Sequence, residues 1–217
     1  MGATISIAEL MTTSGVGFGT SGARGLAAAM SDRVCYAYAA AFLGHLAESD
    51  QIQPGDRVAL AGDLRPSTPR ILAACAAAIV DGGYAPVNCG PIPTPAVANW
   101  AMREGIASLM VTGSHIPDDR NGIKFYRPAG EILKADEAAI RARSVSLPGG
   151  RFTSDGGLLD PSLPVASPVA HRAYVRRYLD FFPPGCLAGR RIALYEHSTV
   201  AREALAEILA GLGAEVV

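Results

Sequence analysis

The sequence predicts an α/β fold, in which helices flank a mixed, mainly parallel sheet, followed by the start of a second, similar α/β unit. Two observations predict it. Segments with apolar residues at helical spacing alternate along the chain with short apolar, β-rich runs. Glycine commonly follows the segments with helical spacing, as it does where helices end. This alternation indicates a parallel or mixed sheet.

The first part of the chain contains the clearest elements. In the first predicted helix, Val34, Tyr38 and Phe42 are among the apolar residues that recur at helical spacing. The three predicted helices span residues 31–48, 68–81 and 94–104. The short apolar runs that alternate with them are predicted strands over residues 57–62, 84–89 and 107–112.

A boundary is predicted after these elements. Residues 147–170 are rich in proline, glycine and serine and show no sustained period, so they are interpreted as a linker or surface loop between a first domain, 1–146, and residues 171–217. The predicted helices and strands after it cover residues 171–182, 191–195, 200–212 and 214–217. These few elements cannot form a hydrophobic core of their own. We therefore expect an incomplete second domain and a chain that is part of a longer one.

Charge and composition narrow the class of protein. A formal net charge of -1 offers no basic surface for a nucleic-acid backbone, so nucleic acid is not an expected partner. The four cysteines form no C-x-x-C pair, which indicates neither a disulfide framework nor a zinc site. No apolar run is long enough to cross a bilayer and no leader pattern is evident, so a cytoplasmic protein without a membrane partner is expected.

The segment VTGSHIPDDRNGIKFY, residues 111–126, places Ser114 directly after an apolar strand. Ligands bind α/β sheets at the carboxyl ends of their strands. Gly113 is expected to let the backbone turn before the serine, and Asn121 with Gly122 to form a tight turn that returns Lys124 toward it. An ordinary β-hairpin with a serine at its tip is the alternative.

A glycine-rich segment, FGTSGARG, lies at residues 18–25. Its glycines would allow the backbone to approach an oxyanion, Thr20 and Ser21 can donate hydrogen bonds, and Arg24 carries a planar donor fork that matches phosphate. The pattern therefore indicates a phosphate-handling loop, although its spacing matches neither the P-loop nor the dinucleotide fingerprint. A flexible turn is the alternative.

Together these segments resemble the α-D-phosphohexomutase superfamily, which includes phosphomannomutase and phosphoglucomutase. The family's F-G-T-S-G-x-R-G is present unbroken, and its T-A-S-H-N-P followed by N-G-x-K corresponds to residues 112–117 and 121–124. Two lesser motifs lie between them: D-x-R-x-S at residues 63–67 and G-x-x-P-T-P at residues 90–95. The resemblance covers the N-terminal portion of the family, its domain I with the phosphoserine loop.

The resemblance implies a mutase that interconverts hexose 6-phosphate and hexose 1-phosphate through phosphorylated Ser114 and a hexose bisphosphate, most nearly a phosphomannomutase. Arg24 is then expected to stabilise the transferring phosphoryl group. Lys124 is the candidate general acid or base, because a crowded, partly desolvated amine loses its proton more readily. The further expected site residues are His115 as a helper and Thr20, Ser21 and Asn121 as phosphate-binding groups.

The resemblance also implies Mg²⁺, held by the phosphate on Ser114 and by an aspartate loop, D-G-D-x-D-R, that this sequence lacks. The adjacent Asp118 and Asp119 are interpreted as a solvated face, and His197 as a structural histidine. The implied partners are the hexose phosphate substrate, a hexose bisphosphate activator and the remainder of the native chain, domains II to IV. Without that remainder, we expect these 217 residues to be inactive.

Two departures from the family pattern affect the site. Gly113 and Ile116 stand where the family usually has alanine and asparagine. With isoleucine at position 116, the side-chain amide of the asparagine is lost, which removes one possible substrate contact. A non-catalytic phosphosugar-binding module is therefore kept as an alternative function. A serine hydrolase using Ser114 and His115 is a weaker alternative, because no G-x-S-x-G elbow is present.

Overall fold

The computed structural model describes residues 2–19 and 22–217 of the chain. The central sheet has the strand order β2-β3-β7-β6-β4-β5, with β8 (Gly130–Glu131) paired to β7. Strands β4 (Arg57–Gly62), β5 (Ala85–Pro91) and β6 (Ala107–Val111) are mutually parallel. Strand β7 (Arg120–Arg127) is antiparallel to its neighbours β6 and β3 (Gly22–Leu26), and β3 is antiparallel to β2 (Gly17–Phe18). The predicted mixed α/β sheet is therefore confirmed, although among its described strands only β4, β5 and β6 are parallel to one another, and the other pairings are antiparallel.

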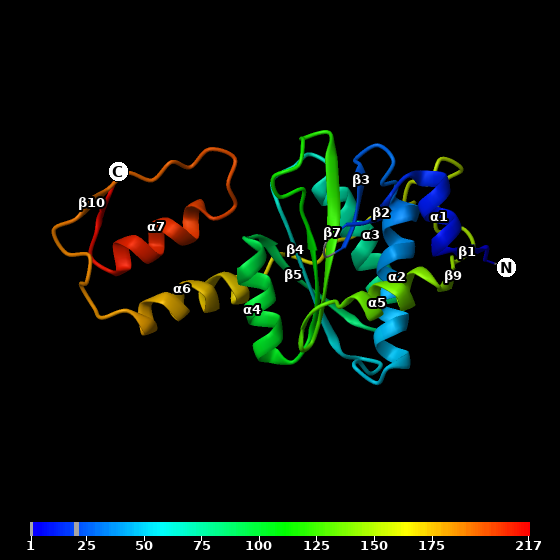
Figure 1. The fold of residues 1–217 in the computed structure, drawn as a ribbon, viewed down its shortest axis with the longest axis horizontal. Helices are drawn as coiled ribbons and strands as arrows, with labels where there is room; N and C mark the ends of the chain where they lie inside the picture. The colour runs from blue at the N-terminus through cyan, green and yellow to red at the C-terminus, as the bar shows by residue number, and fades with distance from the viewer. Residues whose placement is uncertain (1, 20–21) are drawn as a thin grey trace.

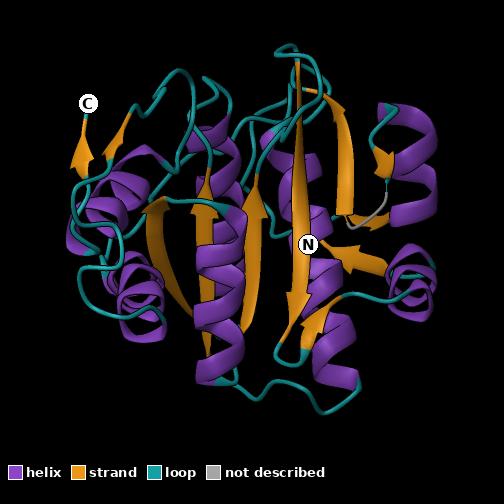
Figure 2. Ribbon diagram, turned by 60° about the vertical axis from the view of Figure 1, so that its left-hand side comes forward, coloured by secondary structure: helices purple, strands orange, loops and turns teal. Residues whose placement is uncertain are grey.

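Helices cover both faces of this sheet (Figures 1 and 2). Helices α2 (Asp32–Glu48) and α3 (Thr68–Asp81) pack on one face, and α4 (Thr94–Glu104) packs on the other. The sequence of β4 explains how one strand supplies two cores: Val58 and Leu60 belong to the first, whereas Ala59 and Ala61 belong to the second. Successive side chains of a strand point to opposite faces, so a continuous apolar run is required where both faces are covered.

Local sequence signals account for the helix boundaries. The predicted ranges of α3 and α4 agree with the structure at both ends, and α4 ends at Gly105, whose φ of 67° is the left-handed conformation that glycine adopts without strain. Helix α2 begins one residue later than predicted, because Ser31 is its N-cap and accepts a hydrogen bond from the Val34 amide at 3.4 Å.

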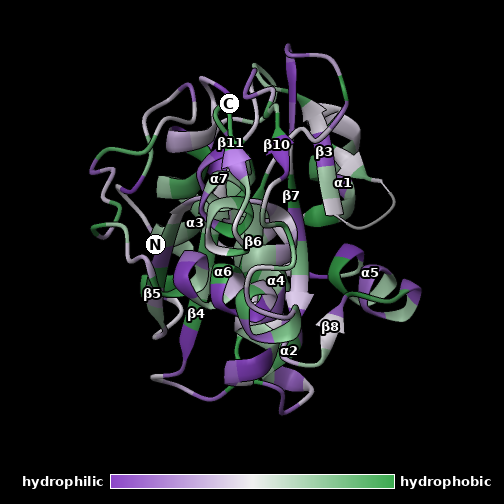
Figure 3. Cartoon of the chain, turned by 90° about the vertical axis from the view of Figure 1, so that its left-hand side faces the viewer, coloured by the Kyte–Doolittle hydropathy of each residue, from purple (hydrophilic) through white to green (hydrophobic). Residues whose placement is uncertain are grey.

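Several elements were not predicted. Helix α1 (Ile7–Ser14) is capped by Ser6 and ends at Gly15, with a φ of 70°, so the serine and glycine signals were present in the sequence. Strands β1 (Thr4–Ser6) and β9 (Ser144–Ser146) pair with each other. Helix α5 (Lys134–Arg141) shows purple and green residues side by side in Figure 3, as expected where one helical face is buried.

A buried aspartate fixes α5 to α2. Asp136 accepts hydrogen bonds from the Leu133 amide at 2.7 Å and from His45 at 2.9 Å, and its third contact is the Arg127 guanidinium at 3.3 Å. Burial opposes ionisation, but these partners together hold the pKa of Asp136 below its ordinary value of 3.8. The charge is therefore stabilised inside the first domain.

The predicted turn at Asn121 and Gly122 is wrong. Both residues lie within β7, where Asn121 is opposite Gly25 and Gly122 is opposite Arg24 of β3. The chain instead turns just upstream, where the Arg120 amide donates to the Pro117 carbonyl at 3.1 Å. The long antiparallel pairing with β3 draws the Asn-Gly pair into the strand, and an isolated sequence window does not contain that partner.

Residues after the first sheet form a smaller α/β unit beside α4 (Figure 1). It contains helices α6 (Val169–Phe181) and α7 (Arg202–Gly211) and the parallel strands β10 (Arg191–Ile192) and β11 (Glu215–Val216), which are shorter than predicted. Its small core consists of Val175, Ala204, Ile208 and Leu212. The domain boundaries themselves stay a prediction.

The segment before this unit lies along the first domain. The Leu158 amide donates to Asp32 at 2.7 Å, and the Asn88 side chain donates to the Pro164 carbonyl at 2.8 Å.

The four cysteines are free, and burial raises the pKa of the Cys35 thiol to about 12. Among the described helices, none has both the length and the apolar character that a bilayer crossing requires.

Candidate active site

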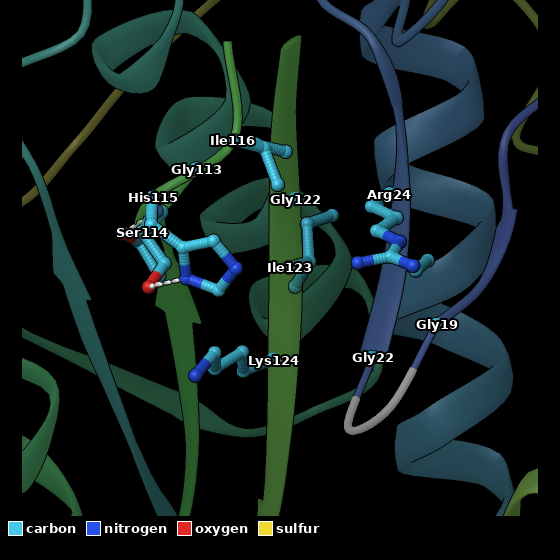
Figure 4. A pocket seen from close by; sticks show the side chains of 12 residues that line it. Gly19, Gly22, Arg24, Gly113, Ser114, His115, Ile116, Gly122, Ile123 and Lys124 are labelled. Atoms are coloured by element: carbon cyan, nitrogen blue, oxygen red, sulfur yellow. Dashed lines mark hydrogen bonds between the residues drawn. The ribbon is translucent and has the colours of Figure 1, made fainter.

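A pocket of about 110 Å³ lies where the loop after β6 meets strands β7 and β3. The loop contributes Ser114, His115 and Ile116, β7 contributes Lys124, and β3 contributes Arg24. Ser114 and Arg24 are 90 positions apart in sequence, but β7 lies between their two elements and is paired with β3 and β6. The sheet register therefore brings the predicted serine, histidine, lysine and arginine to one pocket (Figure 4).

Ser114 has an uncommon backbone conformation. Its φ of 51° lies in the left-handed region, which is costly for residues other than glycine. The Ser114 amide donates to the Thr112 hydroxyl at 2.9 Å, and the Ile116 amide donates to the Gly113 carbonyl at 3.0 Å. These bonds close a tight turn that exposes the Ser114 side chain, so its hydroxyl is accessible to a reacting group.

His115 lies directly beside the serine. Its Nδ1 atom is 3.3 Å from the Ser114 Oγ atom, so adjacent residues do make the contact that a nucleophile and a base would need. Both side chains are exposed, and no hydrogen bond from His115 to a carboxylate is found in the described part of the chain. The arrangement therefore lacks the third, orienting group of a hydrolase triad within these residues.

The two cations approach the pocket from neighbouring strands. Lys124 is opposite Gly22 of β3 and Met110 of β6, and its side chain is half-buried. In Figure 4 the Lys124 amine lies below the Ser114 and His115 side chains, and the Arg24 guanidinium lies across β7 from them. Neither cation has an ion pair with an acidic residue among residues 2–19 and 22–217, so both charges are available to an anion in the pocket.

Glycines leave the space that this arrangement needs. A Cβ atom on Gly22 would overlap the backbone of Ile123, and one on Gly19 would lie 2.7 Å from the Arg24 Nε atom. A Cβ atom built on Gly122 would lie 3.3 Å from the Thr112 carbonyl oxygen and 3.3 Å from the Arg24 Cβ atom. Side chains at these positions would collide with neighbouring backbone or displace Arg24, which explains why the motif needs glycine here.

Asn121, another predicted site residue, does not line the pocket. Asn121 is fully buried, and its amide donates to Ser67 at 2.9 Å and to Thr68 at 3.0 Å, so its side chain holds the strand in place and does not reach the pocket. The predicted phosphate contacts of Thr20 and Ser21 lie outside the described residues.

The acidic residues near the serine loop and His197 do not form a metal site. Asp118 and Asp119 are exposed on the turn before β7, and His197 is exposed with its ring 5.9 Å from that of Tyr195. In the described ranges no three His, Cys, Asp or Glu side chains cluster as a metal site would require. These residues alone do not fit a Mg²⁺ ion.

The D-x-R-x-S motif, for which the sequence predicted no role, lies beneath the serine loop. Asp63 Oδ2 accepts a hydrogen bond from the Gly113 amide at 2.9 Å, and Asp63 Oδ1 accepts from Thr68 at 2.6 Å. Arg65 donates to backbone carbonyls of the loop. The position of the motif directly after β4, next to β6 in the sheet, was the available signal.

The fold and the pocket define an α/β/α domain that presents a serine between cations. Residues 15–146 match the family described as phosphoglucomutase/phosphomannomutase, alpha/beta/alpha domain I. The chain belongs to this family of enzymes, as the sequence resemblance indicated.

Individual relatives agree with this assignment. The chain is 46% identical over 201 residues to a phosphomannomutase of Sinorhizobium fredii (strain NBRC 101917 / NGR234), covering 92% of the chain and 42% of the relative. It is 41% identical over 211 residues to a phosphomannomutase of Salmonella muenchen, covering 96% of the chain and 41% of that relative. The chain therefore spans about two fifths of the length of these relatives.

A solved structure supports the fold. The crystal structure of a phosphoglucomutase/phosphomannomutase family protein from Burkholderia thailandensis superimposes with a TM-score of 0.69 at 22% identity, covering 98% of this chain and 44% of that one. At this level of identity the similarity concerns the fold alone.

Proposed function

We propose that the protein containing this chain is a phosphohexomutase, most nearly a phosphomannomutase, that interconverts hexose 6-phosphate and hexose 1-phosphate. The observation that carries the proposal is the exposed Ser114 hydroxyl in a pocket shared with Arg24 and Lys124. The 41–46% identity to proteins named phosphomannomutase supports the substrate class.

In the proposed transfer, the bond between phosphorus and the Ser114 oxygen breaks as a bond from phosphorus to a sugar hydroxyl oxygen forms. The sugar hydroxyl loses its proton to the neutral Lys124 amine, and the departing Ser114 oxygen gains one from protonated His115, whose Nδ1 is 3.3 Å away. Arg24 stabilises the negative charge on the transferring oxygens. Rephosphorylation of Ser114 from the bisphosphate reverses these steps at the other sugar oxygen.

Two further components come from the family resemblance. Mg²⁺ would need ligands from outside the described residues, and a hexose bisphosphate would charge the enzyme with its first phosphoryl group. Since the chain lacks the D-G-D-x-D-R loop, we propose that it cannot turn over hexose phosphate on its own.

Intact mass tests the proposal. The complete native polypeptide, incubated with a hexose 1,6-bisphosphate, should gain one phosphoryl group, and Ser114→Ala should gain none while melting at the same temperature, since the exposed hydroxyl contributes little to burial. Ser198→Ala is the matched control, because Ser198 is also exposed and has a φ of 53° outside the pocket. Undiminished uptake by Ser114→Ala would exclude Ser114 as the acceptor. Absence of uptake by the unaltered protein would favour a non-catalytic binding module.

A further inference from the structure

Arg65 lies beneath the serine loop and binds three of its backbone carbonyls. Its Nη2 atom donates to the Ile116 carbonyl at 2.6 Å. Its Nη1 atom donates to the Pro117 carbonyl at 2.6 Å and to the Arg120 carbonyl at 2.9 Å. The Arg65 side chain is only 16% exposed. One planar, permanently charged group therefore gathers carbonyls from three different residues of the loop.

Asp63 completes this contact at the other end of the loop. Its Oδ2 atom is 3.3 Å from the Arg65 Nε atom and also accepts the hydrogen bond from the Gly113 amide at 2.9 Å. Arg65 and Asp63 thus hold both the start of the loop, at Gly113, and its end, at Arg120. Ser114, with its left-handed φ, lies between these fixed points.

Gly113 is the residue that makes room for this arrangement. A Cβ atom built on Gly113 would overlap the Arg65 guanidinium, with the Nη2 atom at 2.6 Å, inside the 3.0 Å that real Cβ atoms keep. The φ of Gly113 is not in the left-handed region, so its backbone would accept alanine. The Arg65 side chain is what the built Cβ meets, so residues 65 and 113 are coupled through direct contact.

We propose that Arg65 is a positioning residue of the phosphoryl-transfer site, which holds the loop so that the Ser114 hydroxyl faces the pocket, and that it is coupled to residue 113 through direct contact. The inference rests on the proposed function for its effect on rate. The hydrogen bonds compensate the strained, left-handed backbone of Ser114. When they are lost, the loop relaxes and the serine oxygen moves away from its productive position.

The test measures phosphoryl uptake by the complete native polypeptide from a hexose 1,6-bisphosphate, over a range of bisphosphate concentrations. Arg65→Lys keeps the charge but loses the fork, so the maximal rate should fall roughly 10- to 100-fold, as a displacement of about 1 Å at a reacting atom can cause. The concentration that gives half the maximal rate should change less than about twofold, because Arg65 does not line the pocket. A change confined to that concentration would overturn the proposal.

Arg70→Lys is the matched control. Arg70 donates to the carbonyls of Met30 and Ala27 and pairs with Asp32 at 2.6 Å, so it has the same chemistry on helix α3 without touching the serine loop. Its loss should lower stability and leave the maximal rate within about twofold. An equal fall in rate for Arg70→Lys would show that Arg65 acts only through general stability.

A double-mutant cycle tests the coupling. Gly113→Ala should slow uptake roughly 10-fold or more in the presence of Arg65, and by less than about twofold in the Arg65→Ala background, where the overlap is gone. Additive effects would refute the contact. If Arg65→Ala does not fold, Arg65→Lys and Gly113→Ala still carry the test through their separate rates.

A second measurement separates this inference from the proposed function. If the unaltered protein takes up no phosphoryl group, the proposed function fails, and amide hydrogen exchange in the present chain then tests Arg65 alone. The bonded amides of Gly113, Ile116 and Arg120 should exchange at least about 10-fold faster in Arg65→Lys and unchanged in Arg70→Lys. Unchanged exchange in Arg65→Lys would overturn the positioning role whatever the reaction.

Discussion

Replacing Asp63 with asparagine tests how much the serine loop depends on the aspartate beneath it. The Asp63 carboxylate accepts from the Arg65 amide at 3.1 Å and from Thr68 at 2.6 Å through Oδ1. Through Oδ2 it accepts from the Gly113 amide at 2.9 Å and faces the Arg65 Nε atom at 3.3 Å. An asparagine can satisfy only one of these two pairs of donors, because its NH₂ group is itself a donor.

The magnitude follows from the donors left without an acceptor. If the amide oxygen replaces Oδ1, the Gly113 amide is left unsatisfied, at a cost of about 1–3 kcal/mol, and the charged contact with Arg65 is lost, at a cost of about 1.5 kcal/mol or more. Because Asp63 is only 15% exposed, water compensates little. Asp63→Asn should therefore lower the free energy of unfolding by about 3 kcal/mol and the melting temperature by roughly 6–12 °C.

Urea unfolding followed by tryptophan fluorescence measures this change. Trp100 is the single tryptophan and is 8% exposed in the core between α4 and the sheet, so it reports on the domain that contains the site. Asp118→Asn, on the exposed turn of the same loop, is the control and should change stability by less than about 0.5 kcal/mol. A loss below about 1 kcal/mol for Asp63→Asn would refute the assignment of Asp63 as the support of the loop.

Three further predictions concern other residues. Arg24→Lys should lower mutase activity at every pH without moving the pH profile. Lys124→Arg should lower mutase activity roughly a hundredfold or more, without rescue at high pH, because arginine does not release its proton. Near-full activity of Lys124→Arg in pH-dependent kinetics would exclude Lys124 as the base. Because the pKa of Asp136 is lowered in the folded protein, its contribution to stability should be complete at neutral pH and should disappear as the pH falls below 3.8 through the folded value. Asp136→Asn should therefore flatten the acid limb of a plot of the free energy of unfolding against pH. An unchanged acid limb would contradict this. Tyr38→Phe should destabilise the domain by about 1–2 kcal/mol in chemical denaturation, because its buried hydroxyl donates at 2.5 Å to a backbone carbonyl just before β2; a cost near zero would show that this bond contributes nothing.

Local sequence by itself determined several elements of the first domain and the position of the serine. The ranges of α3, α4 and β4 follow from apolar periodicity and from flanking glycines and prolines, and those signals act over a few neighbouring residues. The placement of Ser114 at the end of a buried strand followed in the same way, because a strand and the loop after it are contiguous. The resemblance implied that Arg24 and Ser114 act on the same phosphoryl group, and the register of β3 against β7 places both residues at one pocket.

The tertiary structure decided everything that depends on a partner distant in the chain. Asn121 has the sequence of a turn, but pairing with β3 and hydrogen bonds to Ser67 and Thr68, 54 and 53 positions away, make it part of a strand. Arg65 reaches carbonyls 51 to 55 positions away, which no local pattern encodes. The physical reason is that propensity and periodicity describe a segment's own preferences, whereas buried hydrogen bonds and strand register are set by groups that only folding brings together.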